Sequence, residues 1–216
     1  LRLYSNRQGR KEAPRGFLRC VLVILFAACL LSFPLCGQSK SSAGNRAHII
    51  LGSTASEIER YAAKELRRYL YQISGTFPDI RSNPKNIVRP SFLVGQAGSN
   101  PAIAKLVAEG KIQVSKDNPG AQGYVLKRIV IDGKPVIVIA GSDEIGCLYG
   151  VYGLLADHYG LGFFFSGDIL PDKKTPLTLV DVDEKKVPSM YIRGFLPWTN
   201  FPQSATSYSW EDWKYI

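Results

Sequence analysis

The sequence predicts an α+β fold, a two-layer sandwich in which two main helices cover a mixed, largely antiparallel sheet. Short apolar runs typical of strands alternate with two long segments of helical periodicity. Asp132-Gly133 lies between two β-branched runs, 123–131 and 135–140, which is a strong signal for an antiparallel hairpin. The 216 residues, 45% apolar and 21% charged, have a globular composition and a length for one domain, or one domain with part of another.

The first elements of this domain follow the 38–45 linker, which is rich in Ser and Gly. Residues 47–51 predict a buried strand that Gly52 ends, and 53–57 carry the hydroxyls and acids of a helix N-terminus. Apolar residues then recur at steps of three and four as far as Ser74, with Gly75 as the stop. On the opposite side of this helix we expect a solvated surface formed by Lys64, Arg67 and Arg68.

The middle of the chain predicts a loop, a strand and a short helix. Residues 76–90 are rich in Pro, Asn and Ser, which favours a loop, and 91–95 form an apolar run typical of a strand. Asn100 before Pro101 predicts a capped helix over 101–109.

A second long helix follows the hairpin, opening at 141–144 with Ser142 as its cap and ending at Gly160. Gly146, Gly150 and Gly153 fall on roughly one side of it, although each glycine costs about 1 kcal/mol of helix propensity. We therefore expect a close approach of this helix to the sheet. Residues 163–165 and 178–182 predict two further strands.

Residues 1–37 predict a signal peptide. Six basic residues and one acid precede an apolar run of 16 residues, 20–35, which is short for a membrane span. We expect export to the periplasm or the medium; an uncleaved anchor and a lipid-anchored form are the less favoured alternatives. Beyond this segment the only cysteine is Cys147, which we expect to be a core residue rather than a nucleophile.

Several function classes are disfavoured by charge and motif. Of the net charge of +9, the first 37 residues hold +5, so the rest is only mildly basic and nucleic-acid binding is not expected. His48 and His158 lie far apart without Cys or acidic partners at ligand spacing, so we expect no metal and no cofactor. The acid pairs at 57/59 and 143/144 are explained by helix starts, and we assign no catalytic residue.

Residues 187–216 differ from the rest because all three Trp residues fall in the last 19 positions. A strand, a loop and a capped helix start at 209–216 together resemble the first β/α unit of a (β/α)₈ barrel, which takes about 250 residues. The chain is therefore interpreted as a fragment. Aromatic rings that cover sugar C–H faces, and an Arg that binds hydroxyls or carboxylates, are typical of carbohydrate sites.

Residues 46–186 resemble the N-terminal α+β domain of family 67 glycoside hydrolases, the α-glucuronidases, and the related domain of bacterial β-N-acetylhexosaminidases. The resemblance rests on four stretches: 55–66, 123–126, 139–155 and 160–164. After them Arg193, Trp198 and Asn200 match an Arg-x-x-x-x-Trp-x-Asn segment that opens the α-glucuronidase barrel, whereas the family's Asp before the Asn is Thr199 here.

The resemblance implies an accessory domain of an exported glycosidase that acts on polysaccharide or oligosaccharide. Removal of uronic acid from xylan is favoured, and a hexosaminidase-like activity comes second. It also implies that Arg193, Trp198 and Asn200 bind the carbohydrate substrate, and that the catalytic carboxylates lie later in the barrel. A non-catalytic carbohydrate-binding or structural domain is the alternative. The only membrane contact expected is through the signal segment.

Overall fold

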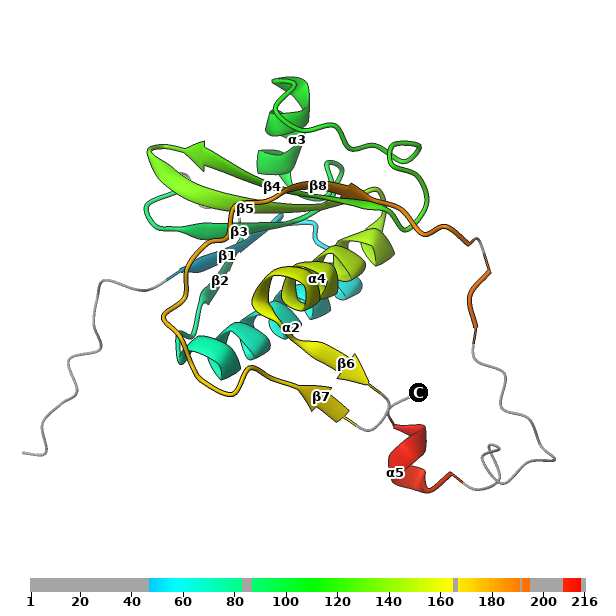
Figure 1. The fold of residues 1–216 in the computed structure, drawn as a ribbon. Helices are drawn as coiled ribbons and strands as arrows, with labels where there is room; N and C mark the ends of the chain where they lie inside the picture. The colour runs from blue at the N-terminus through cyan, green and yellow to red at the C-terminus, as the bar shows by residue number, and fades with distance from the viewer. Residues whose placement is uncertain (1–46, 83–86, 165–166, 191, 195–207, 215–216) are drawn as a thin grey trace, which may run out of the picture. The chain divides into compact units, whose positions relative to one another are not determined.

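The structure, a computed structural model, describes residues 47–82, 87–164, 167–190, 192–194 and 208–214 (Figure 1). All of them belong to the second of the two units into which the chain divides, Gly44–Ile216. The predicted signal segment and the linker lie outside the described residues. In the described part of the chain, no helix combines the length and the apolar character needed to cross a membrane.

A six-stranded mixed sheet forms the centre of the domain, which confirms the α+β class. Its spatial order is β2 (Asp79–Ser82), β1 (His48–Leu51), β3 (Ser91–Gly95), β5 (Lys134–Gly141), β4 (Tyr124–Ile131) and β8 (Asp183–Lys186). The three pairings among β2, β1, β3 and β5 are parallel, and the two made by β4 are antiparallel. The sheet is therefore mixed as predicted, but the antiparallel share of its pairings is smaller than expected.

Three of the parallel strands, β1, β3 and β5, are buried on both faces, and this explains their direction. Ile49 faces one side of the sheet and Ile50 the other, and Phe92 and Leu93 of β3 divide in the same way. Strands covered on both faces have continuous apolar sequences, and such strands belong to parallel sheets joined by helical crossovers. The predicted hairpin is present as β4 and β5, with Asp132 and Gly133 at φ 51° and 71° in its turn.

Two helices, α2 (Glu57–Ser74) and α4 (Glu144–Tyr159), pack side by side against one face of the sheet (Figure 1). Both end as predicted, at Gly75 and Gly160, each in the left-handed conformation that L side chains rarely adopt. The larger core lies between these helices and the sheet. Its fully buried members include Leu66, Leu70, Phe92, Ile137, Ile139 and Leu154.

Helix α4 begins one residue later than predicted. The backbone N–H of Ser142 donates to the Gly123 carbonyl at 2.9 Å, which extends the hairpin pairing past Gly141. Asp143 caps the helix instead, because its Oδ1 accepts the Gly146 N–H at 2.7 Å.

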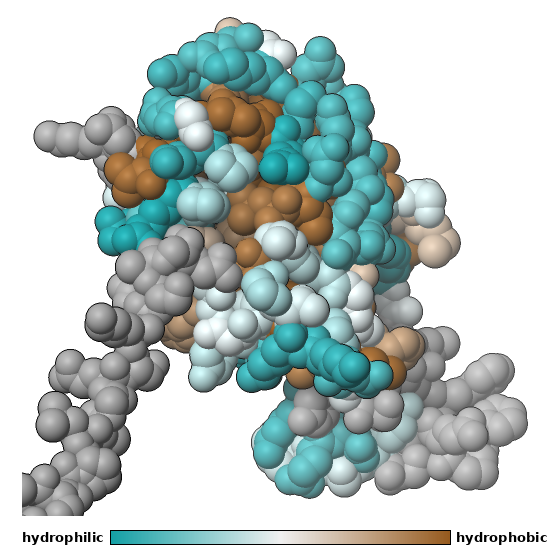
Figure 2. All heavy atoms as spheres, turned by 60° about the vertical axis from the view of Figure 1, so that its left-hand side comes forward, coloured by the Kyte–Doolittle hydropathy of each residue, from teal (hydrophilic) through white to brown (hydrophobic). Residues whose placement is uncertain are grey.

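The opposite face of the sheet carries a second core under the short helix α3 (Pro101–Ala108), which begins at Asn100 as predicted. Ile103 and Leu106 pack there with Leu93, Val136 and Val138. The two main helices therefore cover only one of two buried faces. On the side of the molecule that faces the viewer in Figure 2, hydrophobic residues also reach the surface, where hydrophilic residues surround them.

The short outer strands are where the structure departs from the prediction. Residues 76–90, expected to be a loop, contain the edge strand β2, whose sequence DIRS is polar and mostly exposed. Residues 178–182 form no strand; Val182 is buried in the larger core, and strand β8 begins only at Asp183. The strand expected near 163 is present as β6 (Gly162–Phe164), which pairs with β7 (Gly167–Ile169) in a separate hairpin.

Helix α5 (Trp210–Trp213) begins at Ser209, with Asp212 completing a reciprocal capping box. This matches the helix start predicted at 209. The assignment of residues 187–216 to a barrel stays a prediction, since 195–207 lie outside the described residues.

Candidate functional site

The carboxyl ends of the strands form a candidate site, because ligands of open parallel sheets bind there. Strands β1, β3 and β5 are parallel, so Leu51, Gly95 and Gly141 end at one edge of the sheet. Strand β8 pairs with β4 in the same sense as β5 and ends at that edge too. The loops that meet there are 52–56, 96–100, 120–123, 142–143 and 187–190.

Glu59 is a buried acid at this edge, and both oxygens of its carboxylate accept hydrogen bonds from the protein. Its Oε1 accepts hydrogen bonds from the Gln96 N–H at 3.0 Å, from the Gln96 side-chain amide at 3.2 Å and from the Ser99 hydroxyl. Its Oε2 accepts the Ser56 N–H at 2.7 Å. A buried carboxylate held by four protein donors has a structural role. It joins the start of α2 to the loop after β3, and exposed Glu57 does not share this arrangement.

Gln122 and Asp143 form a second polar group at the same edge. The Asp143 carboxylate accepts the Gly146 N–H at one oxygen and the Gln122 N–H, at 2.7 Å, at the other. Gln122 has φ 59°, an uncommon conformation for a residue other than glycine. The acid therefore holds both the start of α4 and the bend that leads into β4.

Arg193, the first of the predicted sugar-binding residues, contacts this group. Its guanidinium donates to the side-chain oxygen of Gln122, and to the Met190 carbonyl at 2.7 Å. It also lies 5.6 Å from the centre of the Tyr149 ring on α4. Trp198 and Asn200 lie outside the described residues. Sequence reasoning did not identify Gln122 or Tyr149, because only the fold brings them to Arg193.

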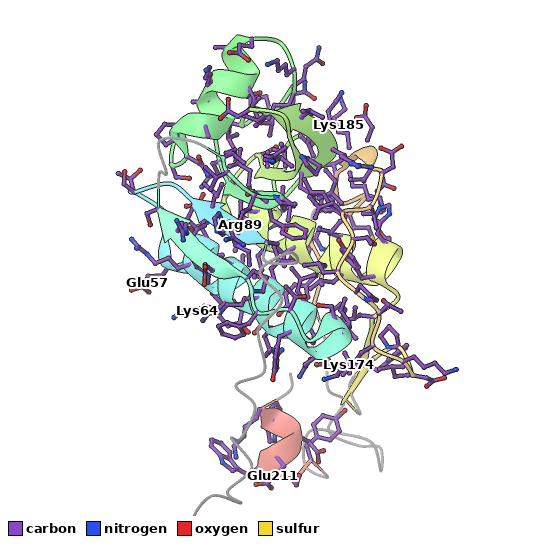
Figure 3. The ribbon with its side chains drawn as sticks, turned by 90° about the vertical axis from the view of Figure 1, so that its left-hand side faces the viewer. Glu57, Lys64, Arg89, Lys174, Lys185 and Glu211 are labelled. Atoms are coloured by element: carbon purple, nitrogen blue, oxygen red, sulfur yellow. The ribbon has the colours of Figure 1, made fainter. Side chains whose placement is uncertain are left out.

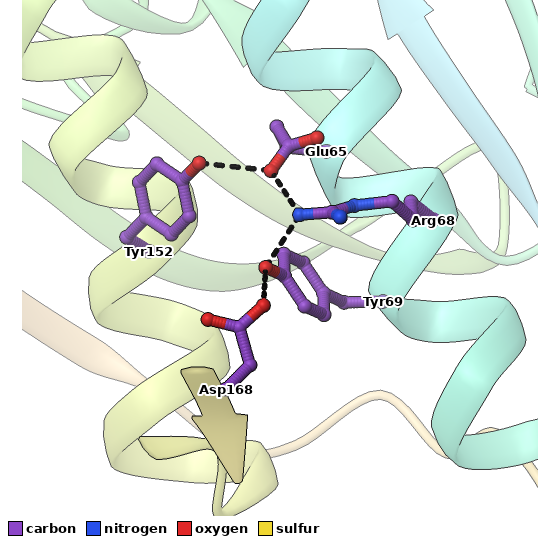
Figure 4. A network of polar contacts seen from close by, with 5 residues as sticks. All are labelled: Glu65, Arg68, Tyr69, Tyr152 and Asp168. Carbon is purple, nitrogen blue, oxygen red and sulfur yellow. Dashed lines mark hydrogen bonds and ion pairs between the residues drawn. The ribbon is translucent and has the colours of Figure 1, made fainter. Parts of the chain in front are cut away.

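A separate polar network joins α2, α4 and the β6–β7 hairpin (Figure 4). Glu65 accepts from Arg68 at 2.7 Å and from the Tyr152 hydroxyl at 2.9 Å. The Tyr69 hydroxyl accepts from Arg68 and donates to Asp168 of β7. Burial raises the pKa of Tyr69 and the hydrogen bond to Asp168 raises it further, so the phenol stays protonated and can donate. This network attaches the hairpin to the helices.

The remaining candidate groups in the described part of the chain are a buried thiol and two surface hollows. Cys147 is fully buried, and burial raises the pKa of its thiol, as expected for a core residue. Among the described residues, no group of three or more His, Cys, Asp or Glu side chains is placed to hold a metal ion. Two surface hollows, of about 270 and 240 Å³, are lined by 110–113 with 183–185, and by the C-terminal ends of α2 and α4 with 171–180. Arg193 lines neither.

A sequence model described as the glycosyl hydrolase family 67 N-terminus matches residues 36–154. The chain belongs to this family. The matched range runs from before β1 into α4, so it includes all of α2, the β4–β5 hairpin and the first part of α4. The resemblance recognised from the sequence is thereby confirmed for the domain.

Other similar proteins are matched over only a small part of their length. The UPF0252 protein MJ1282 of Methanocaldococcus jannaschii is 30% identical over 82 residues, which are 38% of this chain and 23% of that protein. The solved structure of BtGH115A, a family GH115 4-O-methyl-α-glucuronidase with specificity for decorated arabinogalactans, has a TM-score of 0.44 at 22% identity. The match covers 68% of this chain and 18% of that one. A GH138 enzyme that targets pectin rhamnogalacturonan II has a TM-score of 0.41 at 13% identity, over 78% of this chain and 21% of its own.

The family 67 match ends before the predicted sugar-binding residues. Arg193, Trp198 and Asn200 follow residue 154, and their assignment rests on the Arg-x-x-x-x-Trp-x-Asn pattern alone. Their role in binding sugar stays a prediction. The structure adds that Arg193, although it lies beyond the matched range, is in contact with α4 and with the bend before β4 of the family 67 domain.

Proposed function

We propose that this family 67 N-terminal domain is the accessory domain of an exported glycosidase that removes uronic acid side chains from xylan. The observation that carries the proposal is the match of residues 36–154 to the N-terminus of a glycoside hydrolase family. Removal of amino sugars is the second candidate, supported by the Arg193-Gly194 pair that also resembles the opening of hexosaminidase barrels. In this proposal the catalytic acid and base belong to a barrel that follows residue 187.

Arg193 is proposed to bind the carboxylate of the uronic acid. A guanidinium presents two parallel N–H donors, which fit both oxygens of a carboxylate. In the structure it is held by the Gln122 side chain and the Met190 carbonyl, beside the Tyr149 ring. Trp198 and Asn200 are proposed to line the same subsite, with the Trp ring against the sugar C–H face.

The test is an activity assay of the protein extended along its reading frame past Ile216. Purified protein is incubated with glucuronic-acid-substituted xylo-oligosaccharides and, separately, with N-acetylglucosamine oligosaccharides, and released sugars are measured. We expect release of uronic acid, and no activity from the chain of 216 residues used as a control. Release of amino sugar alone would favour the second candidate, and a folded extended protein without activity on either would contradict both.

The role of Arg193 is tested in the extended protein by Arg193→Lys. Loss of bidentate binding should lower kcat/KM about thirtyfold, equivalent to about 2 kcal/mol of transition-state stabilisation, with little change in melting temperature. Unchanged activity together with a lower melting temperature would show instead that Arg193 only attaches the following segment to α4.

A further inference from the structure

We propose that the C-terminal end of α2 carries a second carbohydrate site, a surface that binds polysaccharide chains bearing carboxylate groups. The choice of polymer rests on the proposed function, but the site is separate from Arg193. It is formed by two neighbouring aromatic rings with a cation at each end, in the order Arg67, Phe77, Tyr71 and Lys174, which we call the α2 row.

Local geometry assembles the first three members. Arg67 and Tyr71 are four residues apart on α2, so they lie one above the other on the same side of the helix. Gly75, at φ 71°, reverses the chain after the helix, and Phe77 returns over this side. The Phe77 ring meets the Tyr71 ring edge to face at 5.7 Å, and the Arg67 guanidinium lies 4.7 Å from the Phe77 ring centre.

The fourth member comes from a distant part of the sequence. The Thr175 N–H donates to the Ile73 carbonyl at 3.0 Å, which holds this segment against the end of α2. Lys174 thereby reaches within 5.6 Å of the Tyr71 ring centre. Figure 3 shows Lys64 on α2 and Lys174, from the separate segment, near the C-terminal end of that helix.

Both rings keep much of their surface in water. Tyr71 is 48% exposed and Phe77 is 56% exposed, although each already contacts a cation and the other ring. Contiguous exposed apolar surface with a polar rim is a feature of interaction sites. Rings of this kind cover the C–H faces of sugars.

The charge around the row is positive and largely unneutralised. Lys64, Arg67, Lys173 and Lys174 form no ion pair with an acid among the described residues, whereas nearby Arg68 pairs with Glu65 and Arg81 with Asp79. Asp172 is the acid next to this group in the sequence. Stacking surface combined with cations that have no carboxylate partner favours a ligand that brings its own carboxylates.

A hollow of about 240 Å³ lies at the same end of α2 as the row. Ile73, Ser74, Lys173 and Thr175, which are sequence neighbours of Tyr71 and Lys174, line part of it. Pro176 and Leu177 add apolar lining, and Lys173 supplies a cation. In this proposal the hollow takes one sugar unit of the bound polysaccharide.

The test measures binding of the full chain to glucuronoxylan and to the same glucuronoxylan after its carboxyl groups have been reduced to alcohols. We expect the native protein to bind the acidic polymer about tenfold more tightly than the reduced one. Phe77→Ala should weaken binding to the acidic polymer about tenfold through lost stacking. Arg67→Gln should reduce the preference for it.

Matched controls lie outside the row. Tyr61→Ala removes an aromatic ring of similar exposure, 49%, from the same helix, and Lys105→Gln removes an exposed cation from α3. Both should bind like the native protein, and thermal melts should show that every variant is folded. The inference is overturned by absent binding, by equal affinity for the two polymers, by unchanged affinity of Phe77→Ala, or by equal affinity for single-stranded RNA.

Failure here and failure of the proposed function are distinguishable. Binding is measured on the chain of 216 residues, whereas hydrolysis is measured on the extended protein. An extended protein that hydrolyses glucuronoxylan but loses no affinity in Phe77→Ala would refute the α2 row alone. Selective binding by the row in a protein without hydrolase activity would refute the proposed function alone.

Discussion

Asn100 shows how one buried polar residue can organise several elements. Its Nδ2 donates to the carbonyls of Val94 at 3.0 Å and Ile50 at 3.3 Å, and its Oδ1 accepts the Ala102 N–H at 3.1 Å. The sequence predicted only the last contact, the helix cap. The first two join the ends of β1 and β3, so this one side chain hydrogen-bonds backbone groups of three elements.

Glu59→Gln tests the structural role of the buried Glu59 carboxylate. An amide places N–H donors where the carboxylate now accepts, so at least one of its four hydrogen bonds is replaced by a donor facing a donor. We expect the free energy of unfolding, from urea melts, to fall by about 2 kcal/mol.

The control is Glu57→Gln, which changes an exposed acid in the same turn of α2 and should alter stability by about 0.5 kcal/mol or less. Equal effects of the two substitutions would show that the Glu59 contacts contribute no more than the general charge at the helix start.

Because of His48, we expect the domain to become less stable at mildly acidic pH. The side chain is buried in β1, and this burial, with the nearby charge of Arg81, lowers its pKa from the ordinary 6.5. The unfolded chain therefore binds a proton at a pH where the folded chain does not. The contribution of His48 to stability is complete above about pH 6.5 and is lost as the pH falls through that value toward the lower folded pKa.

Urea melts at about pH 7.5 and about pH 5.5, on either side of the ordinary histidine pKa, measure this effect. The fall in unfolding free energy between the two pH values should be larger for the native chain than for His48→Gln, which cannot take up the proton. The same fall in both proteins would assign the pH dependence to other groups.

At the scale of elements, α4 packs on the sheet with little room to spare. The glycines at 146, 150 and 153 all face neighbouring atoms that an added methyl group would meet. For Gly146 the nearest atom is the Gly123 carbonyl oxygen, 2.1 Å from the position of a Cβ, and for Gly150 it is an Ile139 methyl group at 2.9 Å. The close approach expected from the glycine spacing is thus confirmed.

Gly146→Ala should therefore destabilise the domain although alanine favours a helix. A backbone carbonyl cannot turn aside as a side chain does, so we expect a loss of about 2 kcal/mol or more in urea melts, after a propensity gain of about 1 kcal/mol. Gly98→Ala is the control, because its added methyl group meets open space. A Gly146→Ala protein as stable as the native chain would contradict the packing described here.

The β6–β7 hairpin is an element whose place the helices define. Phe163 lies edge to face with both Tyr69 and Tyr152, at 5.3 and 4.9 Å, and Asp168 accepts from Tyr69. An isolated two-stranded hairpin is only marginally stable in water, so the contacts with α2 and α4 stabilise the β6–β7 hairpin.

At the scale of the whole molecule, helices cover both faces of the sheet. The connection from β1 to β2 runs through α2 on one face, and α3, which follows β3, lies on the opposite face, as Figure 1 shows. The strands between them are therefore buried on both sides, which accounts for their continuous apolar sequences.

The whole chain is expected to be processed on export. Expressed in a bacterial host, it should yield a product that begins between about residues 37 and 44, as judged by N-terminal sequencing of the periplasmic fraction. Leu25→Arg, which places a charge in the apolar run, should keep the product uncleaved and in the cytoplasm. Residues 1–36 intact on a cytoplasmic native product would contradict export.

Much of the local structure was predictable from the sequence, because it depends on residues close together along the chain. The ends of α2 and α4 at Gly75 and Gly160, and the Asp132-Gly133 turn, are of this kind. Each depends on a backbone conformation that glycine, or an Asp before it, adopts at low cost. The family was also recognisable, since its pattern lies within continuous stretches.

Only the tertiary structure decided how these elements pair. Polar β2 and β8 become strands because β1 and β4 offer them free hydrogen-bonding edges, and neither sequence has a strand pattern of its own. The same holds for the two candidate sites: Gln122 reaches Arg193, and Lys174 reaches Tyr71, although each pair lies far apart in the sequence. Such contacts depend on the packing of the whole domain, and no local pattern encodes them.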